Sequence, residues 1–453
     1  MTRAWMVSAV ALSALAFGCV EDAGFDPKTC SAPGIDTTTD PANCGECGHA
    51  CQANEVCSAG ECLGECPDGE TACAGSCRDL ASEASHCGGC DRPCADGFAC
   101  VEGACVAENS GGNPSTDRRI RVLDGQFNVC GRPIYMNGAN TPWHSWNDFG
   151  GEYDEAWWSG HYADLHDAGV NSSRVWITCN GEVGIDITPD GEVLGATPAH
   201  WENLDSFFAI AEERRIYVMA TLMSFDHFKR ATSPWQAWIA SDSAIDSYIE
   251  NYLLPFLDRY GENPYLWSID LMNEPDWVHE QQHMDWDRLR AYFARAARAI
   301  HENSEVLVTV GMASPKYNAP CAGCEPAVTD TQLRNTVDDD AAYLDFYSPH
   351  YYDWVCDVWG NTLHMKPSST NFPPDKPVTI GEHPAHGTVN CGPGSTVDYT
   401  LGEDLEAAFS NGLQGTLPWT SNGVDRNGGF SDVSAAASSL RDAHPTLVFP
   451  ECP

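Results

Sequence analysis

Two glutamates each follow a short apolar run that is typical of a buried β-strand. Glu274 comes after residues 267–272 and Asn273, and Glu382 comes after residues 377–381. Two carboxyl groups held in one pocket can share the work of cleaving a glycosidic bond. One protonates the leaving oxygen, while the other stabilises or attacks the carbon that becomes positively charged. Glu274 and Glu382 are therefore the candidate catalytic residues.

Residues that can form hydrogen bonds or stack on a sugar ring end other apolar runs. They are Arg174, Asn273, His350, Tyr352 and Trp419. Taken singly, each is compatible with a structural role: a buried ion pair for Arg174, a satisfied core histidine for His350, and packing for Trp419. Their repeated position at the ends of the runs favours one shared site.

The elements that would position these residues form an alternating pattern. We predict strands near residues 134–137, 173–177, 217–222, 266–272, 306–310, 345–348, 378–381 and 415–418. Amphipathic helical patterns lie between them, most clearly at 201–214, 244–260 and 288–303. This pattern predicts an α/β fold, a (β/α)8 TIM barrel whose functional groups lie at the C-terminal strand ends. A doubly wound open sheet is the alternative, but no Gly-rich phosphate loop follows the first strand.

The motifs at the fourth and seventh predicted strands resemble those of glycoside hydrolase family 5, in the retaining clan of barrel glycosidases. Asn273-Glu274-Pro275 closes the fourth strand, and the pattern Lys-Pro-Val-x-x-x-Glu occupies residues 376–382. The resemblance extends over about residues 121–453. Three residues alone recur by chance, but the position of this triplet together with the other strand ends makes the match specific.

The resemblance implies a retaining, double-displacement mechanism. Glu274 would be the acid/base, and Glu382 would be the nucleophile that forms a covalent glycosyl–enzyme. Retention requires carboxyl groups about 5–5.5 Å apart, against about 6.5–9.5 Å for inversion. The negative charge of Glu382 would help to keep Glu274 protonated, and its loss on esterification would let Glu274 act as the base.

The family pattern also assigns substrate-binding roles to the other strand ends. Arg174 and Tyr352 would hydrogen-bond the nucleophile, with Arg174 keeping it ionised. Asn273 would bind the 2-hydroxyl of the reacting sugar, His350 would contact the sugar or the acid, and Trp419 would form the platform under that sugar. This chemistry requires no metal and no cofactor.

Two positions depart from the family pattern. His383 follows Glu382 where an aromatic residue is common, and His227 is only a loose counterpart of the polar residue expected after the third strand. These differences concern the sugar subsites and not the catalytic pair.

Aromatic residues in the predicted loops indicate an extended cleft for a polymer. Trp143 and Trp146 follow the first strand, and Trp354 and Trp359 follow the sixth. The sixth loop and the sequence His-x-Tyr-Asp-Trp at 350–354 favour the family's endo-1,4-β-mannanases. The same residues serve its endo-β-1,4-glucanases, which are the alternative.

Two rival functions use the same fold. A non-catalytic carbohydrate-binding protein would be expected to have lost one carboxylate, and both are present. A transglycosylase would pass the same intermediate to a sugar acceptor. We expect a monomer acting on a neutral polysaccharide, either a mannan or a glucan.

The charge of the chain excludes several partners. The 453 residues include 24 Lys and Arg against 65 Asp and Glu, a formal net charge of −41. Such a surface repels phosphate backbones, so no nucleic-acid binding is expected. It also disfavours anionic membranes and acidic polysaccharides.

The N-terminus is typical of an export signal. Arg3 precedes an apolar stretch, residues 4–17, which is too short to span a bilayer. It ends in Leu-Ala-Phe-Gly-Cys, which resembles a bacterial lipobox. We therefore expect a signal peptide over residues 1–18, lipidation of Cys19 as a membrane anchor, and an extracellular or cell-surface location; ordinary cleavage without lipidation is the alternative.

Fifteen of the 22 cysteines fall at or before Cys105. Six of them, between Cys30 and Cys62, recur 43 residues later, between Cys73 and Cys105, which indicates a duplicated module. Cys66 and Cys77 lie outside the repeat and could bridge the two copies. An exported segment this poor in large apolar residues requires disulfides, and these are favoured over zinc ligation.

The Asn-Cys-Gly-x-Cys and His-Cys-Gly-Gly-Cys sequences, each followed by Cys-x-x-Gly-x-Cys, resemble stigma-specific-protein-like cysteine-rich repeats. The resemblance implies an extracellular spacer or binding module. The predicted organisation is a small disulfide-rich module at 19–105, a linker at 106–119 and the barrel at 120–453. Seven cysteines lie in the barrel, so at least one is free or pairs outside it.

Overall fold

The structure is a computed structural model of the chain. It describes residues 36–52, 54–67, 69–90, 93, 98–101, 104–107, 117–319, 326–353, 355–356, 360, 362–370, 372, 376–385, 389–390, 396–397 and 399–452. The chain divides into two compact units, residues 1–105 and 106–453. The predicted signal peptide and Cys19 lie outside the described residues.

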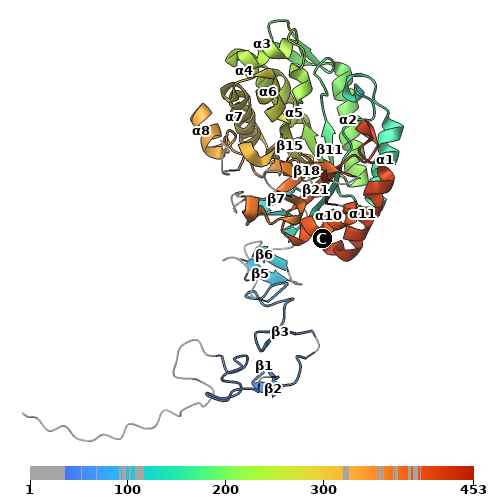
Figure 1. Cartoon of the computed structure of the whole chain (residues 1–453). Coiled ribbons are helices and arrows are strands. Elements are labelled where there is room, and N and C mark those ends of the chain that lie inside the picture. The colour runs from blue at the N-terminus through green and yellow to red at the C-terminus, as the bar shows by residue number, and fades with distance from the viewer. Residues whose placement is uncertain are drawn as a thin grey trace, which may run out of the picture. The chain divides into compact units, whose positions relative to one another are not determined.

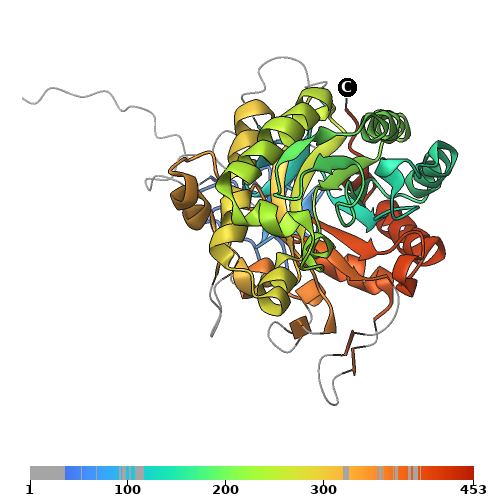
Figure 2. The same cartoon turned by 90° about the horizontal axis from the view of Figure 1, so that it is seen from above.

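Eight parallel strands form the centre of the larger unit, and helices surround them (Figures 1 and 2). In chain order the strands are β10 (Met136–Asn140), β11 (Ser172–Trp176), β14 (Tyr217–Thr221), β15 (Leu266–Asn273), β16 (Leu307–Met312), β17 (Ser348–Pro349), β18 (Thr379–Pro384) and β21 (Gly415–Trp419). Two backbone bridges, Tyr347 to Val378 and His350 to Glu382, join β17 to β18 and close the ring. The predicted TIM barrel is confirmed.

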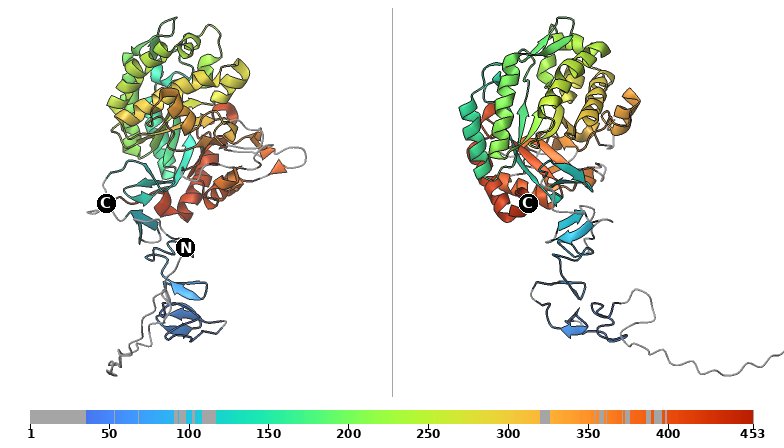
Figure 3. Two further views of the ribbon diagram at one scale, coloured as in Figure 1. Left: turned by 90° about the vertical axis from the view of Figure 1, so that its left-hand side faces the viewer. Right: turned by 180° about the vertical axis from the view of Figure 1, so that it is seen from behind.

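The described helices lie outside the ring of strands, as both views of Figure 3 show. They are α1 (Glu155–Asp167), α2 (Pro198–Arg214), α3 (Pro234–Ala240), α4 (Asp242–Tyr248), α5 (Leu254–Tyr260), α6 (Pro275–Gln282), α7 (Trp286–Asn303), α8 (Asp330–Val337), α10 (Leu401–Ser410), α11 (Phe430–Ala443) and α12 (Pro445–Val448). Within the part of the chain that the structure describes, no helix has the length and apolar character needed to cross a bilayer.

Local sequence explains where the principal helices begin. The Thr197 side chain accepts a hydrogen bond from the amide of His200 and caps α2, whose first residue is Pro198. Asp285 caps α7 in the same way. The single helix predicted over 244–260 is interrupted instead by a π-helical segment, Ile249–Leu253, between α4 and α5.

The core has two main parts. Side chains between the strands and the helices form the larger cluster, which includes fully buried Trp158, Trp238 and Tyr292. A second cluster fills the end of the barrel at which the strands begin, where Phe127 packs edge-on against Trp267 and Phe346. Phe127 comes from a small sheet of β7 (Arg121–Leu123), β8 (Gln126–Val129) and β9 (Arg132–Pro133). The opposite end, where the strands finish, stays available for polar groups.

Short strands and disulfides build the smaller unit. Its strands are β1 (Val56–Ser58), β2 (Glu61–Leu63), β3 (Thr71–Cys73), β4 (Ser76–Arg78), β5 (Phe98–Val101) and β6 (Ala104–Ala107), the last reaching two residues past Cys105. Cys44 pairs with Cys57, and Cys87 pairs with Cys100 at the corresponding positions of the second copy. Cys66 pairs with Cys77. The predicted disulfide-rich module is confirmed.

Three of the seven barrel cysteines show how the odd count is resolved. Cys130, after β8, is disulfide-bonded to Cys452 near the C-terminus. Cys179, after β11, is free and buried, as the odd number of cysteines allowed. Cys321, Cys324 and Cys391 lie outside the described residues.

Candidate active site

Glu274 leaves the fourth barrel strand in an unusual backbone conformation. Its φ of 49° and ψ of 55° place it in the left-handed region, between the end of β15 and Pro275, the first residue of α6. A residue before proline is disfavoured in the right-handed helical region, which is consistent with a sharp turn here. The amide of Glu274 donates to the carbonyl of Gly311 on β16 at 2.7 Å. The turn is therefore anchored to the neighbouring strand.

Glu382 lies on β18 and is held by a buried arginine. Arg174, at zero exposure on β11, donates from Nη1 to Glu382 Oε1 at 2.6 Å. The same guanidinium donates from Nε and Nη2 to Asp270 Oδ2 at 3.0 and 2.7 Å, and from Nη2 to Asn273 Oδ1 at 2.8 Å. One cation thus lies between two carboxylates. Burial raises the pKa of Glu382, and the charge of Arg174 opposes that shift.

Two glycines leave room for this cluster. A β-carbon at Gly311 would lie 2.6 Å from Arg174 Nη2, 2.9 Å from Asp270 Oδ2 and 3.1 Å from His350 Nε2. A β-carbon at Gly381 would lie 2.4 Å from Ser348 Oγ. Such distances are too short for any side chain without displacement of the neighbours, so the charged groups can meet only because these strands carry glycine.

His350 and Tyr352 reach the two glutamates from the segment after β17. His350 Nδ1 lies 2.9 Å from Glu274 Oε1 and 3.6 Å from Glu382 Oε2. The Tyr352 hydroxyl donates to Glu382 Oε2 at 3.0 Å. Burial lowers the pKa of His350 to about 4, so the imidazole is neutral near pH 7. The structure brings both predicted residues to the carboxyl pair.

The two carboxyl groups lie close to each other. One oxygen of Glu274, one oxygen of Glu382 and a ring nitrogen of His350 all lie within 4.8 Å of one another. Burial raises the pKa of Glu274 to about 7, while Arg174 and a hydrogen bond from the Trp277 side chain oppose the shift. Glu274 therefore retains a large protonated fraction at neutral pH, as a general acid must.

Two further residues of the cluster were not among the predicted site residues. Asp270 lies within the apolar run of β15, and its Oδ1 accepts from the amide of Gly311 at 2.8 Å. Asn140, at the end of β10, donates from Nδ2 to the carbonyls of Gly381 and Leu417 at 2.9 and 2.7 Å. The sequence contained a sign of each: Asp270 is an acid inside a buried strand, and Asn140 is an amide at the end of the first strand.

Trp419 ends β21 beside other indole rings. Its ring centroid lies 5.1 Å from that of Trp176 and 6.1 Å from that of Trp143. The guanidinium carbon of Arg174 lies 4.4 Å from the Trp176 centroid. Trp419 is 7% exposed, and the peptide bond that follows it is cis. The predicted sugar platform and the predicted Trp143 thus belong to one cluster next to the charged groups.

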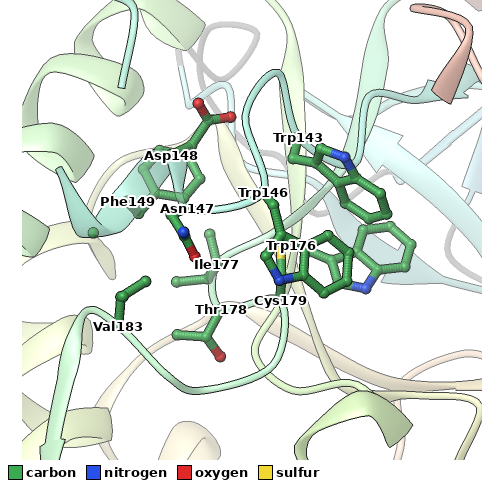
Figure 4. Close-up of a pocket in the computed structure, with 11 residues that line it drawn as sticks. Trp143, Trp146, Asn147, Asp148, Phe149, Trp176, Ile177, Thr178, Cys179 and Val183 are labelled. Carbon is green, nitrogen blue, oxygen red and sulfur yellow. The ribbon is translucent and has the colours of Figure 1, made fainter. Parts of the chain in front are cut away.

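A pocket adjoins this aromatic cluster (Figure 4). Figure 4 shows the indole rings of Trp143, Trp146 and Trp176 on one side of the pocket and Val183 on the other. Asp148 also lines it, and burial raises the pKa of that carboxyl to about 6. Trp354 and Trp359, which were predicted to line the cleft, lie outside the described residues.

The two residues that departed from the family pattern are both buried. His227 lies with Nε2 3.0 Å from Thr178 Oγ1 and Nδ1 3.1 Å from the carbonyl of Ser224. These contacts are made to the barrel's own loops. His383 has zero exposure and follows Glu382 on β18. Burial lowers the pKa of both histidines, to about 3 and about 4 respectively.

Comparison with known proteins distinguishes the two units. Residues 58–108 match the stigma-specific STIG1-like protein family. The chain is 25% identical over 338 residues to a mannan endo-1,4-beta-mannosidase of Mytilus edulis, covering 68% of this chain and 89% of that protein. It is 23% identical over 361 residues to the enzyme of the same name from Cryptopygus antarcticus, covering 71% and 90%.

Solved structures share the barrel. The endo-1,4-beta-mannanase of Eisenia fetida superposes with a TM-score of 0.63 at 23% identity, covering 71% of this chain and 95% of that one. The beta-1,4-mannanase of Aplysia kurodai gives 0.63 at 20% identity, covering 74% and 100%. Together with the strand-end motifs, these comparisons confirm the resemblance predicted from the sequence: the chain joins a barrel like that of the glycoside hydrolase family 5 mannanases to an N-terminal region like the stigma-specific cysteine-rich proteins.

Proposed function

We propose that the barrel hydrolyses β-1,4-linked mannan at internal bonds with retention of configuration. The observation that carries the proposal is the approach of Glu274 and Glu382, whose carboxylate oxygens lie within 4.8 Å of each other. Carboxylate oxygens this close are compatible with the retaining geometry, in which the two groups lie about 5–5.5 Å apart, and favour it over the about 6.5–9.5 Å of inversion.

In the first step Glu382 attacks the anomeric carbon while Glu274 gives its proton to the leaving oxygen. Arg174 and Tyr352 each donate to a different oxygen of Glu382, so the nucleophile is oriented before the substrate arrives. Asn273, next to the acid, is placed for the 2-hydroxyl of the reacting sugar. Trp419 supplies the apolar face beneath that sugar.

In the second step a water attacks the glycosyl–enzyme and Glu274 removes its proton. The change of role follows from electrostatics. While Glu382 is ionised, its charge and the burial of Glu274 both favour the protonated acid. Once Glu382 is esterified that charge is gone, the pKa of Glu274 falls, and the carboxylate can act as a base.

Mannan is favoured as the substrate because the similar proteins carry mannanase names. Endo action on a polymer is supported by the aromatic residues beside the site, Trp143 and Trp146, the second of which is 36% exposed. β-1,4-Glucan is the alternative, because the same catalytic groups serve either sugar.

Substitution of each glutamate tests the proposal. E382Q is expected to abolish release of reducing sugar from mannan. E274A is expected to be rescued by azide on an activated aryl β-mannoside, giving a β-mannosyl azide, because azide needs no general base. E280Q is the matched control, since Glu280 lies on α6, the helix that follows Glu274, and pairs with Lys316 away from the carboxyl pair. Full activity of E382Q, or an α-configured first product by NMR, would exclude the mechanism, and faster hydrolysis of cellulose than of mannan would exclude the substrate.

We also propose that the protein is exported and anchored through Cys19. Disulfides such as Cys51–Cys62 and Cys73–Cys90 in the small unit are compatible with an oxidising compartment. Labelling with a fatty-acid analogue in the native host is expected to mark the protein and to fail with C19A. Label retained by C19A would exclude this anchor.

A further inference from the structure

The aromatic loop, residues 141–147, follows β10 and carries Trp143 and Trp146, whose ring centroids lie 4.7 Å apart. Both rings line one pocket with Trp176 (Figure 4). Trp143 also packs against the buried cluster that includes Trp176 and Trp419. The tyrosine that donates to the nucleophile packs against the same cluster. The aromatic loop is therefore continuous with the catalytic groups.

The aromatic loop lies across the barrel's mouth from the catalytic acid. In the ring of strands, β11 and β14 separate β10 from β15, at whose end Glu274 lies. β21, which ends in Trp419, is separated from β15 by β10, β11 and β14 on one side and by β16, β17 and β18 on the other. The acid protonates the leaving oxygen, so the leaving part of the substrate lies on the side of β15. The aromatic loop would therefore meet the retained part, the sugar linked to the non-reducing side of the reacting sugar.

Asp148 holds the backbone of this loop with both oxygens of its carboxyl group. Oδ2 accepts from the amide of His144 at 2.7 Å, and Oδ1 accepts from the amide of Ser145 at 3.1 Å. The amide of Asp148 donates to the carbonyl of Ser145 at 3.1 Å and closes the turn. Asp148 is 3% exposed, so water competes little for these bonds. Trp143 and Trp146 flank the two amides that Asp148 holds.

Two further contacts hold the loop from other elements. Asn422, which follows β21, donates from Nδ2 to the carbonyl of Trp143 at 2.7 Å. The His144 ring stacks on Trp157 of α1, with centroids 4.1 Å apart and ring planes 17° apart. The backbone is thus fixed at Trp143 by Asn422 and at the next two residues by Asp148, so the position of the Trp143 ring depends on both side chains.

The two amide bonds of Asp148 require two acceptors. Each oxygen of a carboxylate is an acceptor, whereas the side chain of asparagine offers one acceptor and one NH₂ donor. The NH₂ group of an asparagine at this position would face a backbone N–H. Burial raises the pKa of Asp148 to about 6, and the amides of His144 and Ser145 oppose that shift, so the carboxyl group is mostly ionised near pH 7. D148N therefore removes one bond and the charge, and it leaves the size of the side chain almost unchanged.

We propose that Asp148 and Asn422 are positioning residues, which hold the Trp143 ring where it stacks on the sugar at the non-reducing side of the reacting sugar. This role depends on the proposed function and names the side chains that control how the same cleft binds the retained end of the substrate. A ring that is fixed before the substrate arrives loses little conformational freedom on binding. Binding energy from that sugar can then lower the barrier at the reacting sugar.

Two aryl glycosides that differ by one sugar test this role in the full-length protein. The 2,4-dinitrophenyl β-mannoside places only the reacting sugar in the cleft, whereas the 2,4-dinitrophenyl β-mannobioside also places a sugar at Trp143. D148N and N422A are each expected to lower kcat/KM for the mannobioside by about tenfold, and kcat/KM for the mannoside by about twofold or less. E152Q is the matched control, because it removes one charge beside the loop and still offers an acceptor to Ser145 Oγ. It should cleave both glycosides as the unaltered protein does.

A double-mutant cycle identifies the residue through which Asp148 acts. W143A removes the ring, so it should itself lower the preference for the mannobioside over the mannoside. D148N should lower that preference no further in W143A, because the ring that Asp148 positions is already absent. Additive effects of D148N and W143A on the preference would show that Asp148 acts through another group and would overturn the proposal.

A merely structural role of Asp148 would slow the hydrolysis of both glycosides alike. Equal losses on the two substrates in D148N, or no loss on either, would therefore overturn the proposal. If the melting temperature showed that D148N does not fold, N422A would decide by the same two measurements. Failure of the unaltered protein to hydrolyse either glycoside would overturn the proposed function and this role with it, whereas an unchanged preference in folded D148N would overturn this role alone.

Discussion

The guanidinium of Arg174 and the carboxylate of Glu382 form a buried ion pair, with Nη1 and Oε1 2.6 Å apart. The same guanidinium also holds Asp270, so one cation orients the nucleophile and balances a second buried acid. A buried charge left without its partner costs several kcal/mol. The geometry of the nucleophile and the stability of the barrel's mouth therefore depend on one side chain.

Replacement of Arg174 by lysine should separate the effect of the positive charge from the effect of the guanidinium's planar geometry. R174K keeps a positive charge but cannot reach Glu382, Asp270 and Asn273 together, because an ammonium lacks the planar fork of a guanidinium. We expect kcat/KM on manno-oligosaccharides to fall by roughly 10²-fold or more, a loss of about 2.7 kcal/mol of transition-state stabilisation. The acid limb of the pH–rate profile should move to higher pH. Unchanged kinetics in R174K would show that the fork is not required.

Removal of the Tyr352 hydroxyl should remove one of the hydrogen bonds that orient Glu382 and leave its charge unchanged. A hydrogen bond to a charged group contributes about 1.5–3 kcal/mol, so Y352F is expected to lose roughly tenfold to a hundredfold in kcat/KM. Y351F is the matched control, because the adjacent hydroxyl contacts Cys356 and not the carboxyl pair. Equal losses in the two variants would mean that the effect comes from packing and not from the bond to Glu382.

The pH dependence of kcat/KM follows from the two glutamates. Burial raises the pKa of Glu274 to about 7, and activity requires its protonated form, so the rate should fall as pH rises through about 7. Glu382 must be ionised, and burial raises its pKa, so the rate should fall again at acidic pH. With a 2,4-dinitrophenyl β-mannobioside, whose leaving group needs no proton, the alkaline limb of kcat/KM should disappear. An alkaline limb that persists with this substrate would assign it to another group.

The site residues at the strand ends could be predicted because each directly follows an apolar run, which is a local feature of the sequence. Glu274, Arg174 and Trp419 follow apolar runs, and in a parallel barrel all such ends meet at one mouth. The structure places these residues together, and the strand bounds differ from those predicted by a few residues. β17 is the exception in length, with two residues where four were predicted, because closure to β18 is made by isolated bridges.

The residues that sequence reasoning missed act through partners far along the chain. In the sequence, Asp270 is only a charged residue within an apolar run. In the structure it accepts hydrogen bonds from Arg174, which lies 96 residues earlier in the chain. The need for glycine at position 311 follows from the side chains of Arg174, Asp270 and His350, which come from two other strands and from the segment after β17. The π-helical segment between α4 and α5 was missed because the amphipathic pattern continues through it. Local patterns thus indicate where a residue lies, but not which residue it contacts.

A methyl group at Gly311 should disrupt the site without touching either glutamate. In G311A the new carbon would lie 2.6 Å from Arg174 Nη2, so the cluster must move. Overpacking of a buried position typically costs about 1–3 kcal/mol, and kcat/KM should fall at least tenfold. G402A is the matched control, since nothing lies within 4 Å of that position. Equal activity and melting temperature in both variants would show that the cluster tolerates displacement.

We expect Asp276 to support the position of Glu274 while it remains protonated and therefore uncharged. It lies two residues after Glu274 and is 2% exposed; its Oδ2 accepts from the amide of Ala313 at 2.9 Å, while its Oδ1 has no partner among the described residues. Burial raises the pKa of Asp276 to about 8, and the nearby Glu274 adds to the shift. The protonated acid can tie the turn of Glu274 to the end of β16 without adding a charge. D276N should therefore keep the pH profile and most of the activity, whereas D276A should lose roughly tenfold or more, because the bond from Ala313 is lost.

Thermal stability measured against pH gives an independent test of that neutral state. The folded protein keeps a proton on Asp276 that the unfolded chain releases above its ordinary pKa of 3.8. The stability linked to this proton is therefore fully present below pH 3.8 and is lost progressively as pH rises towards about 8. Asparagine has no proton to lose, so the melting temperature of D276N relative to the unaltered protein should increase between pH 4 and pH 7. A difference that stays constant over this interval would mean that Asp276 is ionised in the folded state, and the pH–rate profile of D276N should then change as well.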